Sequence, residues 1–238
     1  MSWPLQALLQ ARRKRKALPA ELRQRLRDAH QRFGNRPGLD EPVALARFVA
    51  LDLETTGPHM FTDRIISIGA IAVTERTVRH GDAFEAVLQQ AQSSHHDNIL
   101  IHQIGGQAQL AGSDPAEALV RCLEYIGDSR VVAFRAEFDA TVFRREVRAL
   151  LGWRAWPRFI DLASLLPALF PGTDNDSLEE WANHFGLPVT GRHQAIADAY
   201  ACACLLTIVL DVAGRAGVRT ARDLRDVEGA QRWLGKRR

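Results

Sequence analysis

Phe48-Val-Ala-Leu-Asp52-Leu-Glu54-Thr-Thr-Gly57 is an apolar run that carries two carboxylates at its end and then stops at a glycine. The run predicts a central strand, and successive side chains of a strand point to opposite faces. Asp52 and Glu54 therefore project together, on the face opposite to Leu51 and Leu53. At about 3.3 Å of rise per residue their Cα atoms lie roughly 7 Å apart, so both carboxylates can reach one cation or a pair of cations.

Two like charges at the end of an apolar strand are costly unless they are protonated or compensated by a cation. The alternative is that the strand simply ends here and that both acids are solvated, which for an isolated Asp-x-Glu is the more common situation. Other carboxylates of the chain therefore decide whether Asp52 and Glu54 form a metal site.

The length and composition of the chain indicate an ordinary globular protein. Its 238 residues are enough for one domain with a sizeable core, and 46% of them are hydrophobic and 25% charged. No uninterrupted apolar run reaches the ~18 residues that cross a bilayer. The basic cluster at residues 12–16 follows an apolar stretch, whereas a secretory signal begins with positive charge. We therefore expect a cytoplasmic protein with no membrane partner, and its three cysteines are expected to be core residues.

Positive charge is concentrated at the amino terminus. Residues 1–48 hold 11 Lys and Arg against 4 Asp and Glu, whereas the remainder holds 20 against 24. Such a segment can hold a phosphate backbone electrostatically, or it can be a solvated helix face. We predict three parts: a basic helical extension over residues 1–45, a main domain over 46–213 and a helical tail over 214–238.

Hydrophobic periodicity and capping residues predict the secondary structure. After the opening strand, strands are expected at 65–73, 82–88, 130–134 and 159–160. Helices are expected at 4–16, 19–33, 115–126, 138–151, from 161 onward, and at 178–185, 194–213 and 220–234. Residues 89–112 are expected to form a long irregular connection. Strands first, and then strands mixed with helices, indicate a single α/β domain.

Two further acids lie in apolar surroundings near the ends of predicted elements. Asp139 follows a strand at the start of a helix, and Asp198 lies on a nearly apolar helix. His193 precedes Asp198 by five residues, which turn a helix by about 500°, so we expect His193 to act from the preceding loop. Taken singly, these residues could instead be a helix cap, a buried paired acid and a surface loop residue.

Four segments together resemble the DEDDh family of 3′-to-5′ exonucleases, which includes the epsilon proofreading subunit of bacterial DNA polymerase III. The resemblance covers roughly residues 47–212. The matching segments, in chain order, are Asp52-Leu-Glu-Thr-Thr-Gly57 continued by Arg64-Ile-Ile-Ser-Ile-Gly-Ala-Ile71, His102-Gln-Ile104, Glu137-Phe138-Asp139 and Arg192-His-Gln-Ala-Ile-Ala-Asp198-Ala199.

The resemblance implies a ribonuclease H-like fold, in which helices flank a mixed central sheet, with the helical extension as an appendage. It implies His193 as the general base, a role suited to a side chain whose ordinary pKa is near 6.5. It also implies two Mg²⁺ or Mn²⁺ ions, which prefer oxygen ligands, held by Asp52, Glu54, Asp139 and Asp198. The terminal nucleotide would be held by Thr55, Thr56, Gly57 and His102.

The chain departs from the family pattern at a few positions. Phe134 and Arg135 occupy the places where the second motif usually carries His-Asn. Ser67 replaces a common acid, and Gln103 replaces the loop glycine. None of these changes removes an implied metal ligand.

The resulting hypothesis is a metal-dependent 3′-to-5′ exonuclease that degrades DNA to nucleoside monophosphates, with a polymerase or a repair protein as partner. An exoribonuclease of the same fold is the nearest alternative, since the metal chemistry does not depend on the sugar. A non-catalytic nucleic-acid-binding module is a third reading, because fold alone does not prove activity.

Overall fold

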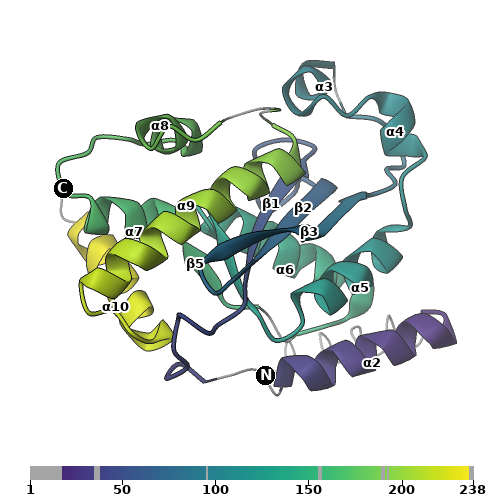
Figure 1. Cartoon of the computed structure of the whole chain (residues 1–238). Helices are drawn as coiled ribbons and strands as arrows, with labels where there is room; N and C mark the ends of the chain where they lie inside the picture. The colour runs from purple at the N-terminus through teal and green to yellow at the C-terminus, as the bar shows by residue number, and fades with distance from the viewer. Residues whose placement is uncertain are drawn as a thin grey trace, which may run out of the picture.

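The computed structural model describes residues 18–34, 38–94, 96–154, 157–188, 191 and 193–235. The helix predicted at 4–16 lies outside these residues. Within them, the strands form one sheet in the order β3-β2-β1-β4-β5 (Figure 1). β1 pairs antiparallel with β2 and parallel with β4, so the sheet is mixed, as predicted. The strands are β1 Phe48–Thr55, β2 Ile65–Thr74, β3 Thr77–Val87, β4 Arg130–Ala133 and β5 Phe159–Asp161.

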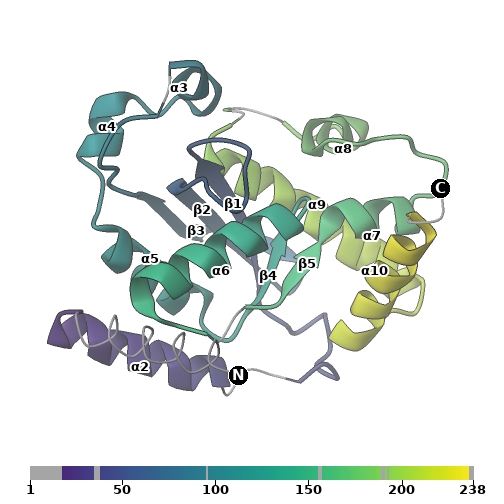
Figure 2. The ribbon, with the colours of Figure 1, turned by 180° about the vertical axis from the view of Figure 1, so that it is seen from behind.

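Helices cover both faces of the sheet (Figures 1 and 2). One face packs against α2, α5 and α6, and the other packs against α7, α9 and α10. Three short helices, α3, α4 and α8, lie on the connections between the larger elements. The helices are α2 Ala20–Gly34, α3 His96–His102, α4 Gly106–Leu110, α5 Pro115–Ile126, α6 Glu137–Leu151, α7 Leu162–Leu169, α8 Leu178–His184, α9 Ala195–Arg215 and α10 Ala221–Gly235.

The alternation of β1 sorts its side chains as the sequence predicts. Leu51 and Leu53 are buried against α5 and α6, whereas Phe48 and Ala50 are buried against α9. Because side chains alternate along a strand, the next residues on the α9 side are Asp52 and Glu54. Both acids therefore project toward the long helix at the carboxyl end of the central strand.

β3 begins earlier than the predicted start at residue 82. A tight turn joins it to β2, and both central residues of that turn, Glu75 and Arg76, have positive φ values of 52° and 56°. Hairpins of this kind usually carry Asn-Gly or Asp-Gly. Glu-Arg gives no such signal, so the sequence predicts a longer loop between the two strands.

The connection predicted to be irregular, residues 89–112, contains α3 and α4. Gln109 is fully buried beneath it. Its side-chain amide accepts a hydrogen bond from the Ser94 backbone at 2.8 Å and donates to the Ser94 hydroxyl and to the Ile104 carbonyl. Polar contacts across the connection, rather than a local apolar pattern, hold these two short helices.

The segments at both ends of the described chain pack onto the main domain. Arg25 of α2 pairs with Glu117 and Glu124 of α5, each at 2.6 Å, so part of the amino-terminal positive charge is used in docking. Leu224 of α10 is buried in the cluster that also contains α9. The division into parts ending at residues 45 and 213 stays a prediction.

The long helix α9 is an element of the core. By length and composition it could cross a membrane, since an 18-residue window has a mean hydropathy of 1.9. Half of that window is buried, however, and α9 packs against β1 and β2. Core helices of globular proteins meet the same criterion. As predicted, Cys122 and Cys202 are buried in the core, whereas Cys204 is only half-buried.

Candidate active site

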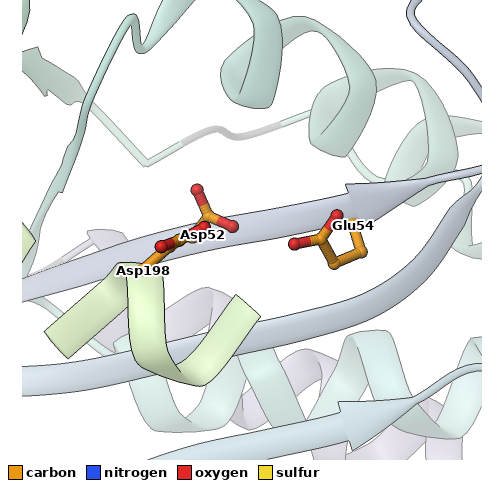
Figure 3. Close-up of side chains that lie close together, drawn as sticks. All are labelled: Asp52, Glu54 and Asp198. Carbon is orange, nitrogen blue, oxygen red and sulfur yellow. The ribbon is translucent and has the colours of Figure 1, made fainter. Parts of the chain in front are cut away.

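Three carboxylates meet where the end of β1 passes the first turn of α9. Asp52 and Glu54 come from the strand, and Asp198 comes from the helix (Figure 3). One ligand oxygen of each lies within 4.8 Å of the others, and all three side chains are partly accessible. The strand spacing predicted from the sequence thus brings Asp52 and Glu54 together, and α9 adds the third acid.

Gly69 of β2 allows α9 to come this close. It is the residue paired with Asp52 across the β1/β2 ladder. A Cβ atom at Gly69 would lie 2.1 Å from the carbonyl carbon of Ala195 and 2.2 Å from the nitrogen of Ile196. A glycine inside a strand often marks such a close backbone approach. Because Gly69 has no side chain, the backbone of the first turn of α9 lies directly on the sheet beside Asp52.

Asp139 reaches the same end of β1 from the opposite layer. It lies in the first turn of α6 and is 5% exposed. The pairing of β4 with β1 stops at Ala50, which leaves the following residues of β1 without a strand neighbour on that side. The backbone of Leu53 there hydrogen-bonds the Asp139 carboxylate, and the charge of Asp139 is felt at Asp52.

Burial and mutual repulsion disfavour the charged forms of these acids. Burial raises the pKa of Asp52 well above its usual value, and repulsion from Asp139, Glu54 and Asp198 adds to it. Burial, with repulsion from Asp198, raises the pKa of Glu54 to about 7. Burial raises the pKa of Asp139 to about 8. A cation among them would compensate this negative charge, and an all-carboxylate donor set suits Mg²⁺ or Mn²⁺.

His193 lies on the loop immediately before α9, as predicted. It is exposed and has a positive φ of 58°, and its backbone N–H donates to Oδ2 of Asp198 at 3.1 Å. With Asp52 and Asp198 it lines a hollow of about 170 Å³ beneath α8. The structure therefore brings His193 to the acidic cluster, and its strained backbone holds Asp198 in place.

Phe134 and Arg135 form a wall of that hollow and a link to α8. Phe134 lines the hollow and packs in the apolar core on the α9 side. Arg135 has a positive φ of 55° and donates from its guanidinium to the carbonyl of Asp176 at 2.9 Å. Where the family carries a polar pair, this chain has an apolar wall and a contact to the segment before α8, while the backbone of Leu53 braces Asp139.

The threonine hydroxyl groups of the turn after β1 form hydrogen bonds within residues 55–63. The Thr55 hydroxyl donates to the Gly57 carbonyl at 2.7 Å, and the Thr56 hydroxyl donates to Asp63 at 3.1 Å. Asp63 also accepts from the backbone of His59. A role for these residues in holding a nucleotide stays a prediction, and in this arrangement it would fall to backbone groups more than to the threonine hydroxyls.

His102 has a place different from the one the motif implies. Its side chain is 1% exposed, Nδ1 accepts from the backbone N–H of Ile104 at 3.0 Å, and Nε2 lies 3.2 Å from the Ser94 hydroxyl. Burial lowers the pKa of His102, which favours the neutral ring that these contacts require. The imidazole therefore braces the α3–α4 connection rather than facing an open surface.

Sequence reasoning missed two residues that shape the site. Gly69 was signalled, because a glycine interrupts an otherwise continuous apolar strand pattern. Asn98 of α3 had no such signal. Its side-chain amide donates to the carbonyl of Thr55 at 2.9 Å and so ties the connection at residues 89–112 to the end of β1.

The raised pKa of Glu54 predicts how stability depends on pH without metal. Between about 4.5 and about 7 the folded protein binds more protons at Glu54 than the unfolded chain, so the free energy of unfolding falls as pH rises. The loss from Glu54 is about 3 kcal/mol and is complete above pH 7. In EDTA, urea unfolding from pH 5 to pH 8 should therefore show a smaller decline for Glu54→Gln than for the wild type. The exposed Glu85→Gln is the control, and equal declines in all three proteins would contradict the expectation.

A mixed sheet whose central strand ends in carboxylates, with a further acid on a helix from each face, defines a ribonuclease H-like exonuclease domain. Residues 49–206 match the RNase_T family model, described as exonuclease. Exonuclease I of E. coli, solved in complex with a dT13 oligonucleotide, has a TM-score of 0.62 and 21% identity over 72% of this chain and 42% of its own. That likeness is one of fold.

Sequence relatives point to the same family. The DNA polymerase III epsilon subunit of Buchnera aphidicola is 28% identical over 165 residues, 65% of this chain and 68% of its own. The PolC-type DNA polymerase III of Caldanaerobacter subterraneus is 25% identical over 193 residues, 80% of this chain but 13% of its own. This chain thus spans a small part of the PolC-type relatives. The chain belongs to the RNase_T exonuclease family, and its resemblance to the DEDDh exonucleases is confirmed.

Proposed function

We propose that this protein is a metal-dependent 3′-to-5′ exonuclease that hydrolyses DNA to nucleoside monophosphates. The observation that carries the proposal is the meeting of Asp52, Glu54 and Asp198 within 4.8 Å at the end of the central strand. Asp139 lies close enough for its charge to raise the pKa of Asp52. The family match supplies the class of reaction, and the acid cluster supplies a place for it.

The carboxylates would hold two divalent ions. Asp52 lies among the other three acids and would hold the ions together with Glu54, Asp139 and Asp198. When bound, such ions supply the positive charge that stabilises the attacking and leaving oxygens of a phosphodiester. The protein contributes fixed ligand positions, because the strand and two helix first turns that carry the acids are parts of the packed core.

His193 is proposed as the general base. His193 lines the same hollow as Asp52 and Asp198, so an attacking water held there would lie within reach of its ring. Asp198 accepts a hydrogen bond from the His193 backbone and so keeps the histidine beside the acid cluster. The exposed position of the ring lets the proton pass on to solvent.

DNA is the proposed substrate, and a polymerase is the proposed kind of partner. One relative is named as a subunit of DNA polymerase III and another as a PolC-type DNA polymerase III, and exonuclease I is solved with a DNA oligonucleotide. An exonuclease that works with a polymerase meets a 3′ end in DNA. The acid cluster itself acts on the phosphodiester and carries no preference between deoxyribose and ribose.

Degradation of matched strands tests the proposal. A single-stranded DNA and an RNA of one sequence, labelled at the 5′ end, are incubated with excess protein and Mg²⁺ or Mn²⁺. We expect the DNA to yield a ladder of shortening labelled fragments and to release nucleoside 5′-monophosphates. Faster shortening of the RNA would show that RNA is the preferred substrate. Early release of the labelled nucleotide would show degradation from the 5′ end. Binding of DNA without hydrolysis in either metal would show that the protein is a non-catalytic binding module.

His193→Gln is expected to lower the turnover of single-stranded DNA about 10²- to 10⁴-fold, the range typical for loss of a general base. The affinity for Mn²⁺ should stay within about twofold, because His193 supplies a proton acceptor and not a metal ligand. The exposed His80→Gln is the matched control and should keep full activity. A His193→Gln protein that retains wild-type turnover, or that loses Mn²⁺ binding, would contradict this role.

A further inference from the structure

A groove runs along β5, one of the two edge strands of the sheet, on the side that has no strand neighbour among the described residues. Figure 2 shows β5 with α6 on one side and α10 on the other. Three adjoining hollows of about 200, 360 and 570 Å³ make up this groove. Arg130 and Arg158 line the first two hollows, and Arg144, Phe159 and Arg232 line the second and third. The shared lining residues show that the three hollows lie next to one another.

The central hollow is strongly basic. Five arginines and one acid, Glu228, supply the charged side chains of its lining. The arginines come from separate parts of the chain: Arg130 begins β4, Arg158 precedes β5, Arg144 lies on α6, and Arg225 and Arg232 lie on α10. On α10 the spacing between residues 225, 228 and 232 places them on one helix face.

Internal ion pairs neutralise only part of this charge. Arg130 pairs with Glu41, and Arg232 pairs with Glu228 at 2.6 Å. Arg144 and Arg158, by contrast, are exposed and form no side-chain hydrogen bond or ion pair with any described residue. Arg225 is exposed too, and Glu228 feels its charge without a hydrogen bond between them. Three guanidinium groups therefore line the groove without a hydrogen bond or ion pair to the part of the chain that the structure describes.

The chemistry of the central hollow favours a phosphodiester strand, whereas acids also line the flanking hollows, Asp128 in the first and Glu137 and Asp161 in the third. Guanidinium groups bind phosphate oxygens through paired hydrogen bonds, and several such groups along one groove suit a ligand with repeated single negative charges. Phe159 is half-buried in the middle of the groove and adds an aromatic surface. Aromatic side chains within a basic groove are typical of single-strand binding, where bases stack while phosphates pair with arginine.

We propose that the groove along β5 binds the backbone of a single-stranded nucleic acid, away from the acidic cluster. The third hollow, at one end of the groove, is lined by Ala136 and Glu137, at the start of the helix that carries Asp139. The groove thus begins beside the candidate active site and leads away from it along the sheet edge. The groove would hold a part of the strand far from the 3′ end that is being hydrolysed. This role rests on the proposed function.

The test compares two triple variants that lose equal positive charge. Arg144→Gln, Arg158→Gln and Arg225→Gln together remove the free groove arginines. The control triple carries Arg32→Gln, Arg121→Gln and Arg219→Gln, which lie on α2, on α5 and before α10, outside the groove lining. Binding of a fluorescent oligothymidylate of about 20 nucleotides is measured by anisotropy in EDTA, from about 50 mM to about 200 mM salt.

We expect the groove triple to bind at least about tenfold more weakly at the lowest salt, and its salt slope to fall by about 2 because up to three phosphate contacts are lost. The control triple should bind like the wild type. Equal affinities for the two triples, or no binding by the wild type, would overturn the proposal. An oligoglutamate of equal charge, or thymidine monophosphate, that binds as tightly as the oligonucleotide and needs the same arginines would overturn it as well.

A hydrolysis measurement separates this proposal from the proposed function. With Mg²⁺, the groove triple should show a raised KM on the long oligonucleotide and an unchanged kcat/KM on a dinucleotide, which is too short to reach the groove. If the protein hydrolyses neither substrate but still shows the arginine-dependent binding, the proposed function is refuted and strand binding by the groove is supported. Equal losses on both substrates would refute a separate strand-binding role.

Discussion

Asp52→Asn is expected to lower the rate of DNA hydrolysis by about 10³-fold or more, because it removes the charge nearest the centre of the acidic cluster. The charges of Asp139, Glu54 and Asp198 all act on Asp52, so loss of the Asp52 charge would weaken cation binding throughout the cluster. Asparagine keeps the shape of the side chain and hence the packing of β1 against α9. Turnover of a 5′-labelled single strand in Mg²⁺ measures the effect.

The control for Asp52→Asn is Asp211→Asn at the far end of α9, where Asp211 pairs with Arg215 near the surface. That variant should keep wild-type turnover. Metal-free Asp52→Asn should unfold at the same temperature as the wild type or higher, since it relieves repulsion among the clustered acids. Full activity of Asp52→Asn, or activity lost only because the protein unfolds, would contradict the assignment of Asp52.

Gly69→Ala is expected to have the second large effect, on stability and activity together. The new methyl group would lie 2.1 Å from the backbone of Ala195, so the first turn of α9 must move away from the sheet. Overpacking against backbone costs about 3 kcal/mol, and a displacement of about 1 Å at a catalytic group can lower a rate about 100-fold. Asp198, on that turn, would move away from Asp52.

Urea unfolding and Mg²⁺-dependent turnover measure the two consequences of Gly69→Ala. Gly81→Ala is the matched control, because a methyl group there meets open space. It should leave turnover unchanged and shift the free energy of unfolding by less than about 1 kcal/mol. Wild-type stability and turnover of Gly69→Ala would show that α9 does not depend on the close approach at this glycine.

Local sequence pattern predicted those features that local physics determines. The alternation around Asp52 gave the correct face of β1, since the side-chain period of a strand is fixed by its backbone. Asp114 caps α5, and Ser177 with Glu180 forms a capping box at the start of α8, where the sequence predicts a helix. These motifs need only residues three apart, so the sequence shows them directly.

Features that depend on tertiary contacts could not be predicted in the same way. The helices α3 and α4 are stabilised by the buried amide of Gln109. They lie in residues 89–112, a segment whose composition suggests a loop. His102 matches a motif but is buried, because Ser94 and Ile104 engage its ring. The groove along β5 is hidden in the sequence for a related reason. Its arginines are spread over residues 130–232, where basic residues do not outnumber acidic ones.

Asp52, Glu54, Asp139 and Asp198 are proposed to form a divalent cation site, and titration of Mn²⁺ into the metal-free protein shows whether they do. Calorimetry at pH 7.5 should show saturable binding of two ions by the wild type, with release of protons because the acids bind protons in the free protein. Asp52→Asn should weaken binding by about 100-fold or more, as expected when one member of a buried charge group is removed. Equal affinities of the two proteins for Mn²⁺, or no saturable binding by the wild type, would contradict the claim.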